Sequence, residues 1–93
     1  MDPVKYLGEC LGTFILISVI LIVGEPIPIA VALLAVIYLV GKLSGGHVNP
    51  VVTLSMFMNN KISSMDFGGY VIAQCFGAVA AVYFAKMVKD EKQ

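Results

Sequence analysis

The stretch Ser44-Gly45-Gly46-His47-Val48-Asn49-Pro50 interrupts a chain that is otherwise dominated by apolar runs. Two glycines and a residue-proline step both break regular helical dihedrals, so an ordinary helix cannot continue through this stretch. Asn49 is a preferred helix N-cap and Pro50 suits the first helical position, which predicts a new helix from Pro50 onward. That helix would end near Asn60 after roughly 15 Å, which is half the thickness of a bilayer.

The chain around this stretch has the composition of a membrane protein. Of its 93 residues, 59% are apolar and 13% are charged, whereas a soluble domain of this size needs a polar surface. Residues 10–24, 26–41, 43–60 and 67–85 carry no charge. A full span takes about 20 residues, so four full spans do not fit. A net charge of zero without a basic cluster excludes nucleic-acid binding.

The charge-free runs predict an all-α membrane protein that forms a single unit over residues 1–93. We expect three spanning helices at about 4–23, 29–43 and 64–88, with a re-entrant loop and half-helix at 44–60. Gly24-Glu25-Pro26-Ile27-Pro28 is expected to form a short extended turn between the first two spans. Tyr38 is expected to pack inside the bundle.

A loop that enters the membrane must be buried in protein or line a water-filled cavity. The N-terminus of the following half-helix brings free N–H groups and a positive dipole end to the midplane, which favours a solute or ion site. Glu9 falls within the first span, where an unpaired carboxylate is costly. We expect Glu9 to accept hydrogen bonds from the N–H groups of the loop, with Gln74 as a second polar support.

Small residues recur at four-residue steps in the first and third spans, a pattern that lets membrane helices pack closely. These expected packing positions are Gly8, Gly12, Gly69, Ala73, Gly77 and Ala81. His47 has no second histidine and no nearby cysteine to complete a metal site, so we expect neither a metal nor a cofactor. The chain also lacks paired carboxylates, an activated nucleophile and a phosphate-binding loop, which argues against an enzyme.

The segment from Ser44 to Leu54 closely resembles the first Asn-Pro-Ala loop of aquaporins, the major intrinsic protein family. Two more segments match in order. Glu9-Cys10-Leu11-Gly12-Thr13-Phe14 looks like the first-helix signature of the family, and residues 70–78 look like its third helix. The resemblance covers essentially the whole chain, but it covers only the first half of the duplicated family pattern.

The resemblance implies a pore with Asn49 and Pro50 at its centre. The amide of Asn49 would donate to a passing oxygen, and the carbonyls of Gly45, Gly46, His47 and Val48 would accept from the solute. Val51 stands where the family motif has alanine. The family's narrow filter usually holds an arginine, and Val52 occupies the equivalent place here, with Ile29 and Ile37 at the other filter positions. An apolar filter leaves glycerol and other small neutral solutes as candidates beside water.

One half of the family pattern implies a pore made by two inverted copies of this chain, with a larger assembly such as a tetramer of dimers as an extension. Lys5, Lys42 and Lys61 fall on one side of the predicted membrane topology. Lys86, Lys89 and Lys92 fall on the other side. This even division gives no preference for one orientation. We therefore expect the chain to insert among the lipids of the cell membrane in both orientations.

Two other functions stay open from the sequence. The first is a holin-like, lesion-forming membrane protein, which would have no need for the Asn-Pro half-helix. The second is a non-conducting accessory subunit or fragment that pairs with a full-length channel.

Overall fold

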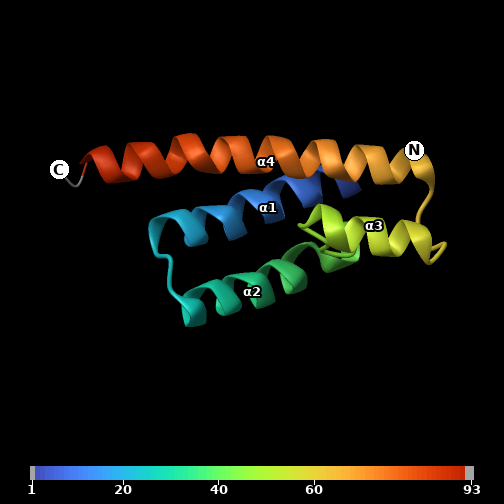
Figure 1. The fold of residues 1–93 in the computed structure, drawn as a ribbon, viewed down its shortest axis with the longest axis horizontal. Helices are drawn as coiled ribbons and strands as arrows, with labels where there is room; N and C mark the ends of the chain where they lie inside the picture. Colours follow the sequence, from blue (N-terminus) through green and yellow to red (C-terminus); the bar gives the residue numbers. More distant parts are fainter. Residues whose placement is uncertain (1, 92–93) are drawn as a thin grey trace.

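The computed structural model describes residues 2–91, which form helices and connecting loops (Figure 1). The helices are α1 (Val4–Ile22), α2 (Pro26–Ser44), α3 (Pro50–Met58) and α4 (Ser64–Glu91). The first, second and fourth are long and apolar enough to cross a membrane, while α3 has only nine residues. The fold class predicted from the sequence is therefore confirmed: three potential spans and one half-length helix.

Two helix boundaries differ from the sequence prediction. Helix α2 begins at Pro26 rather than near Ile29, and Pro26 and Pro28 both lie in its first turn. First-turn N–H groups have no intrahelical partner, so a proline there removes no hydrogen bond. Helix α4 continues to Glu91, beyond the predicted end at Val88, since the charged tail residues are compatible with a solvated helix end.

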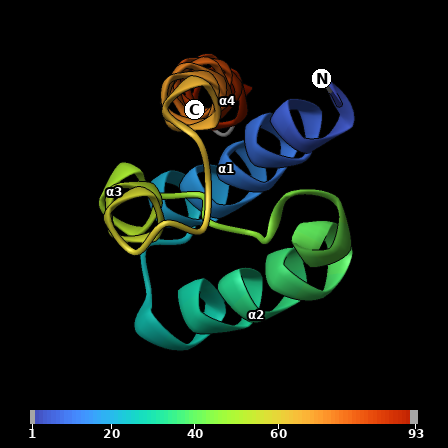
Figure 2. The same cartoon turned by 90° about the vertical axis from the view of Figure 1, so that its right-hand side faces the viewer.

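Helix α1 lies between α4 on one side and α2 on the other (Figure 1). Helix α3 packs against α4, and Figure 2, viewed along the bundle, shows it below α4 and above α2. The loop before α3 turns back into the bundle, and α3 then returns toward the end at which α2 stops. The beginning of α1 and the end of α4 lie at opposite ends of the bundle, as an odd number of spans requires (Figure 1).

The small residues predicted to pack helices divide between two contacts. A side chain at Gly69 would collide with the Tyr6 ring, and one at Gly77 would collide with the Cys10 carbonyl oxygen. These two glycines therefore let α4 touch α1, as the buried Ala73 and Ala81 do on the same helix. The small residues of α1 face α2 and the loop instead. The expected Cβ of Gly8 lies 3.3 Å from Ser44 Oγ, and that of Gly12 lies 2.8 Å from Val48 Cγ1.

Helix α2 packs on α1 through one stripe and leaves the rest of its surface open. Val36 and Val40 are each 1% exposed and form a cluster with Val48 of the loop. Tyr38 is 83% exposed, so the expectation that it packs inside the bundle is wrong. The reason is that, within residues 2–91, α1 is the helix against which α2 packs.

Candidate functional site

The loop between α2 and α3 has an unusual backbone. Gly45 and Gly46 have φ values of 89° and 64°, and Val48 has a φ of 45°. Glycine reaches this left-handed region easily, whereas a β-branched residue does so only when its surroundings hold it there. Val48 is held on both sides, because its side chain is buried with Val36 and Val40 while its N–H is hydrogen-bonded.

Glu9 of α1 is fully buried and receives hydrogen bonds from three parts of the chain. Its Oε2 accepts from Ser44 Oγ at 2.7 Å and from the His47 N–H at 3.0 Å. Its Oε1 accepts from the Val48 N–H at 2.7 Å and from Gln74 Nε2 at 2.9 Å. The structure thus brings together the carboxyl group, the loop and the α4 amide that the sequence analysis grouped.

Thr53 is a second polar centre, to which the sequence analysis gave no role. Its Oγ1 donates to the Asn49 carbonyl at 3.2 Å and accepts from Gln74 Nε2 at 2.9 Å. His47 Nδ1 lies 3.0 Å from the same oxygen. A hydroxyl has a single proton to donate, so a bond from Thr53 to the Asn49 carbonyl requires His47 to donate from Nδ1. The imidazole Nε2 is then left as an acceptor.

The direction of the loop carbonyls follows from these bonds. The N–H groups of His47 and Val48 both point to Glu9. The described chain has no cis peptide bond, and in a trans peptide the carbonyl points opposite to the N–H across the same plane. The carbonyls of Gly46 and His47 therefore face away from the carboxyl group of Glu9.

On the open side of the loop lies a hollow of about 250 Å³. Its lining residues come from α1, α2, the loop and α3: Leu16, Leu33, Ile37, Gly46, His47, Val48, Asn49 and Val52. Two of the three predicted filter positions, Ile37 and Val52, thus share one hollow. Ile29 does not line it, because it lies eight residues earlier on α2, about 12 Å along the helix axis.

Asn49 forms the N-cap of α3 and presents its amide outward. Its Oδ1 accepts from the Val51 N–H at 2.8 Å, and Pro50 occupies the first turn. This cap leaves Nδ2 as the free donor of the side chain, without a partner among the described residues. Asn49 and Pro50 are exposed, and Val51 is 67% exposed. The N-terminus of the half-helix is therefore an uncovered surface that offers hydrogen-bond donors.

Tyr70 is another site residue that the sequence analysis did not single out. It is 4% exposed on α4, and its hydroxyl donates to the Ser44 carbonyl at 2.6 Å. A tyrosine in an apolar helix gives no sequence signal that separates such a role from ordinary packing.

Spanning helices combined with a half-helix that begins inside the bundle define an integral membrane protein built around a re-entrant loop. The profile of the family described as major intrinsic protein matches residues 4–93. The chain belongs to the major intrinsic protein family.

The relatives of this chain include a glycerol uptake facilitator-like protein and aquaporins. The chain is 43% identical over 86 residues to glycerol uptake facilitator protein-like 6 of Lactiplantibacillus plantarum, covering 83% of this chain and 40% of the relative. It is 32% identical over 92 residues to aquaporin Z of Photorhabdus laumondii, with the same coverage. Aquaporin PIP2-7 of Arabidopsis thaliana is 46% identical over 50 residues, which cover 54% of this chain and 18% of the relative.

The chain thus spans less than half the length of the curated relatives that it matches. No solved structure matches it.

Proposed function

We propose that this chain forms a passive membrane channel for water and small neutral solutes, including glycerol, by pairing two copies in inverted orientation. The observation that carries the proposal is the one-sided hollow beside the loop. Carbonyls that face away from Glu9 supply acceptors on that side, and the Asn49 amide supplies a donor. A solute that passes needs both, because it leaves its hydration shell behind.

A second, inverted copy would close the open side of the hollow. A two-fold axis in the membrane plane would place the two α3 N-termini face to face near the midplane. Their dipoles would add to a positive centre, which repels protons and cations while neutral molecules pass. The even division of lysines between the two sides of the predicted topology, in which Lys92 lies outside the described residues, supports insertion in both orientations. A tetramer of such dimers is a natural extension.

The inverted arrangement also gives Ile29 a place in the pore. An in-plane two-fold axis brings the beginning of one α2 to the depth at which the other α2 ends. Ile29 of one copy would then stand level with Ile37 and Val52 of its partner, so each mouth would be apolar and without arginine. Such a mouth favours glycerol, whose carbon backbone is apolar, beside water. The names of the relatives, a glycerol uptake facilitator and aquaporins, agree with this solute range.

The test is stopped-flow light scattering on proteoliposomes that contain this chain alone, first under an impermeant osmolyte and then under a glycerol gradient. The matched variant is Asn49→Asp, because an aspartate keeps the oxygen that caps α3 and removes the amide donor. We expect protein-dependent shrinkage in the wild type and a loss of about tenfold or more in the variant, equivalent to about 1.4 kcal/mol on the transport barrier.

Permeability equal to that of empty liposomes, with folded protein inserted both ways, would overturn the proposal. That result would favour an accessory subunit that needs a longer relative to complete the pore. Leakage of ions together with water, unchanged in Asn49→Asp, would favour a lesion-forming protein, for which the half-helix has no purpose.

A further inference from the structure

We infer that Tyr70 is a positioning residue of the pore loop, and that a chain of aromatic contacts connects it to the charged boundary of the membrane. The inference deepens the proposed function and rests on it for the permeability measurement alone. Its structural part concerns the loop at 45–49 and can be tested on a protein that conducts nothing.

The first step is the bond from Tyr70 to the end of α2. The Ser44 carbonyl belongs to the last turn of that helix, where carbonyl groups have no intrahelical donor. The Tyr70 hydroxyl donates to it at 2.6 Å. Within the described part of the chain α4 does not pack against α2, so this side chain reaches across and ties the two helices directly.

Second, two aromatic contacts of the Tyr70 ring orient its hydroxyl. The Tyr70 ring lies 4.8 Å from the His47 ring, centroid to centroid, at an interplanar angle of 49°. On another side it meets the Tyr6 ring edge-on, at 6.0 Å and 86°. Aromatic rings prefer such tilted and edge-to-face contacts. The ring is therefore held between the loop and α1, and little freedom is left for its hydroxyl.

The third step extends the chain of contacts to the end of the bundle. The Tyr6 hydroxyl donates to Asp66 Oδ1 at 2.7 Å, and Lys5 Nζ lies 2.9 Å from the same carboxylate. Gly69 allows this arrangement, because a side chain there would occupy the space of the Tyr6 ring. Asp66, Tyr6 and Tyr70 thus connect the first turn of α4 to the last turn of α2.

The consequence for the loop follows from the position of Ser44. The two residues after it, Gly45 and Gly46, have left-handed backbones with few steric limits on rotation. A donor on the Ser44 carbonyl fixes the peptide plane from which that rotation starts. The Gly45 N–H holds the same plane through its bond to the Gly41 carbonyl at 2.8 Å. Tyr70 therefore helps to anchor the start of the loop whose carbonyl directions Glu9 sets, and through the loop it influences the solute preference of the pore without touching the solute.

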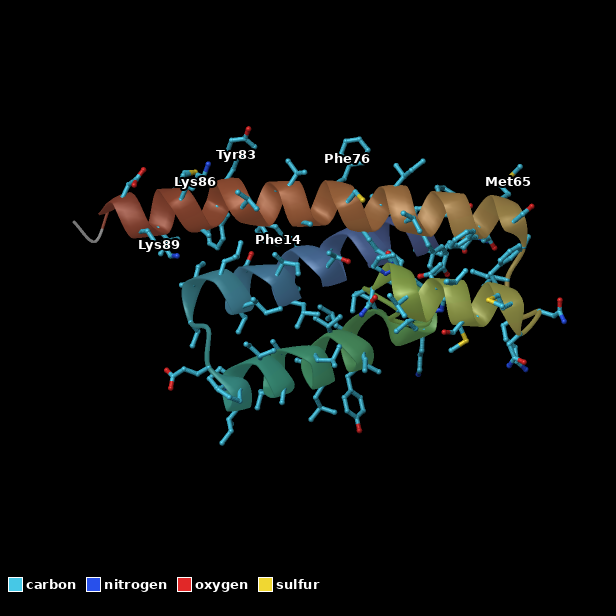
Figure 3. All side chains as sticks on the ribbon, in the orientation of Figure 1. Phe14, Met65, Phe76, Tyr83, Lys86 and Lys89 are labelled. Atoms are coloured by element: carbon cyan, nitrogen blue, oxygen red, sulfur yellow. The ribbon has the colours of Figure 1, made fainter. Side chains whose placement is uncertain are left out.

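The experiment compares Tyr70→Phe with Tyr83→Phe, which removes a hydroxyl from the same helix. Tyr83 is 64% exposed and points away from the bundle (Figure 3). In nanodiscs, we expect amide hydrogen exchange over residues 44–49 to be about five- to tenfold faster in Tyr70→Phe, and unchanged in Tyr83→Phe, as the loss of one buried hydrogen bond predicts. In proteoliposomes, the ratio of glycerol to water permeability should shift in Tyr70→Phe alone.

Wild-type exchange over the loop in Tyr70→Phe would overturn the inference. So would a rise spread equally over α1 and α4, which marks a general loss of packing. If Tyr70→Phe does not fold, Tyr6→Phe decides: it keeps the bond to Ser44 and should raise loop exchange about twofold, and no rise would overturn the inference. Wild-type vesicles that do not conduct would refute the proposed function, while the exchange measurement would still decide the role of Tyr70.

Discussion

The two sides of α1 are packed in opposite ways. Toward α4, neither Gly69 nor Gly77 has space for a methyl group, because the Tyr6 ring lies against the first and the Cys10 backbone lies against the second. Toward the hollow between α2 and α3, large apolar side chains stand uncovered, among them Leu33 at 38% and Ile37 at 45% exposure. Lipid offers apolar groups the same environment as a protein core, so exposure alone does not demand a partner there. The polar groups beside that open side do require a partner, because hydrocarbon cannot form hydrogen bonds with a carbonyl or an amide.

The difference teaches which surface carries the stability of a single copy and which is available for function. The tightly packed side of α1 is called the closed side. There Glu9 accepts four hydrogen bonds, which hold the loop in place. On the open side, the hollow and the N-terminus of α3 are accessible. Substitutions on the closed side should therefore change stability, and substitutions on the open side should change assembly or transport.

The largest expected effect is on the closed side, from Glu9→Ala. The substitution removes an acceptor from four buried donors and leaves the His47 and Val48 N–H groups with none. Each unsatisfied group costs about 1–3 kcal/mol, so the free energy of unfolding should fall by several kcal/mol. Reversible unfolding in bicelles measures it. Glu25→Ala is the control, because that side chain is exposed and forms no cap bond. A Glu9→Ala protein as stable as the control would contradict the role assigned to this carboxyl group.

A smaller loss is expected from Gly77→Ala. The added methyl group would meet the Cys10 carbonyl oxygen and push α4 from α1, at a cost of about 1–3 kcal/mol in the same unfolding measurement. Gly68→Ala adds the same group on the same helix where nothing lies within 4 Å, and it should leave stability unchanged or slightly higher. Equal stability of the two variants would mean that the closed side is less tight than the distances indicate.

The smallest effect is expected on α2, where one substitution in the buried valine cluster is compared with one on the exposed surface. Val36→Ala removes two methyl groups from the buried cluster, and because lipid is equally apolar only the lost packing counts, about 1 kcal/mol. Leu33→Ala, at the exposed lining of the hollow, should change the stability of a single copy little and weaken pairing of the proposed dimer. Energy transfer between labelled copies in liposomes measures the pairing. Identical pairing in both variants would remove Leu33 from the dimer surface.

Much of the fold can be predicted from local patterns along the sequence. Charge-free runs of membrane length predict the three long helices, and Gly45-Gly46 followed by Asn49-Pro50 predicts the break and the short α3. A carboxyl group inside an apolar span needs hydrogen-bond donors, and a buried loop with unpaired N–H groups needs an acceptor. Glu9 could therefore be paired with the loop from the sequence alone.

Other features depend on neighbours that the sequence does not reveal. Val48 adopts a left-handed backbone that its residue type disfavours, because Glu9 and the valine cluster hold it from both sides. Tyr38 and Tyr70 look alike as tyrosines within apolar helices, yet one is exposed and the other is buried at a hydrogen bond. The beginning of α2 at Pro26 shows the same limit, since a Pro-rich segment is compatible with both a turn and a first helical turn.

The length of α4 has a consequence for the membrane in which this protein lies. Its 28 residues extend over about 42 Å, whereas the hydrocarbon of a typical bilayer is about 30 Å thick. Near its end Lys86 lies over the Tyr83 ring at 5.8 Å (Figure 3), a combination that anchors helices at the headgroup level. In a thinner bilayer α4 would tilt to keep that anchor in place. Because its glycines join it closely to α1, the bundle would tilt with it, and bilayer thickness would set the inclination of the half-helix.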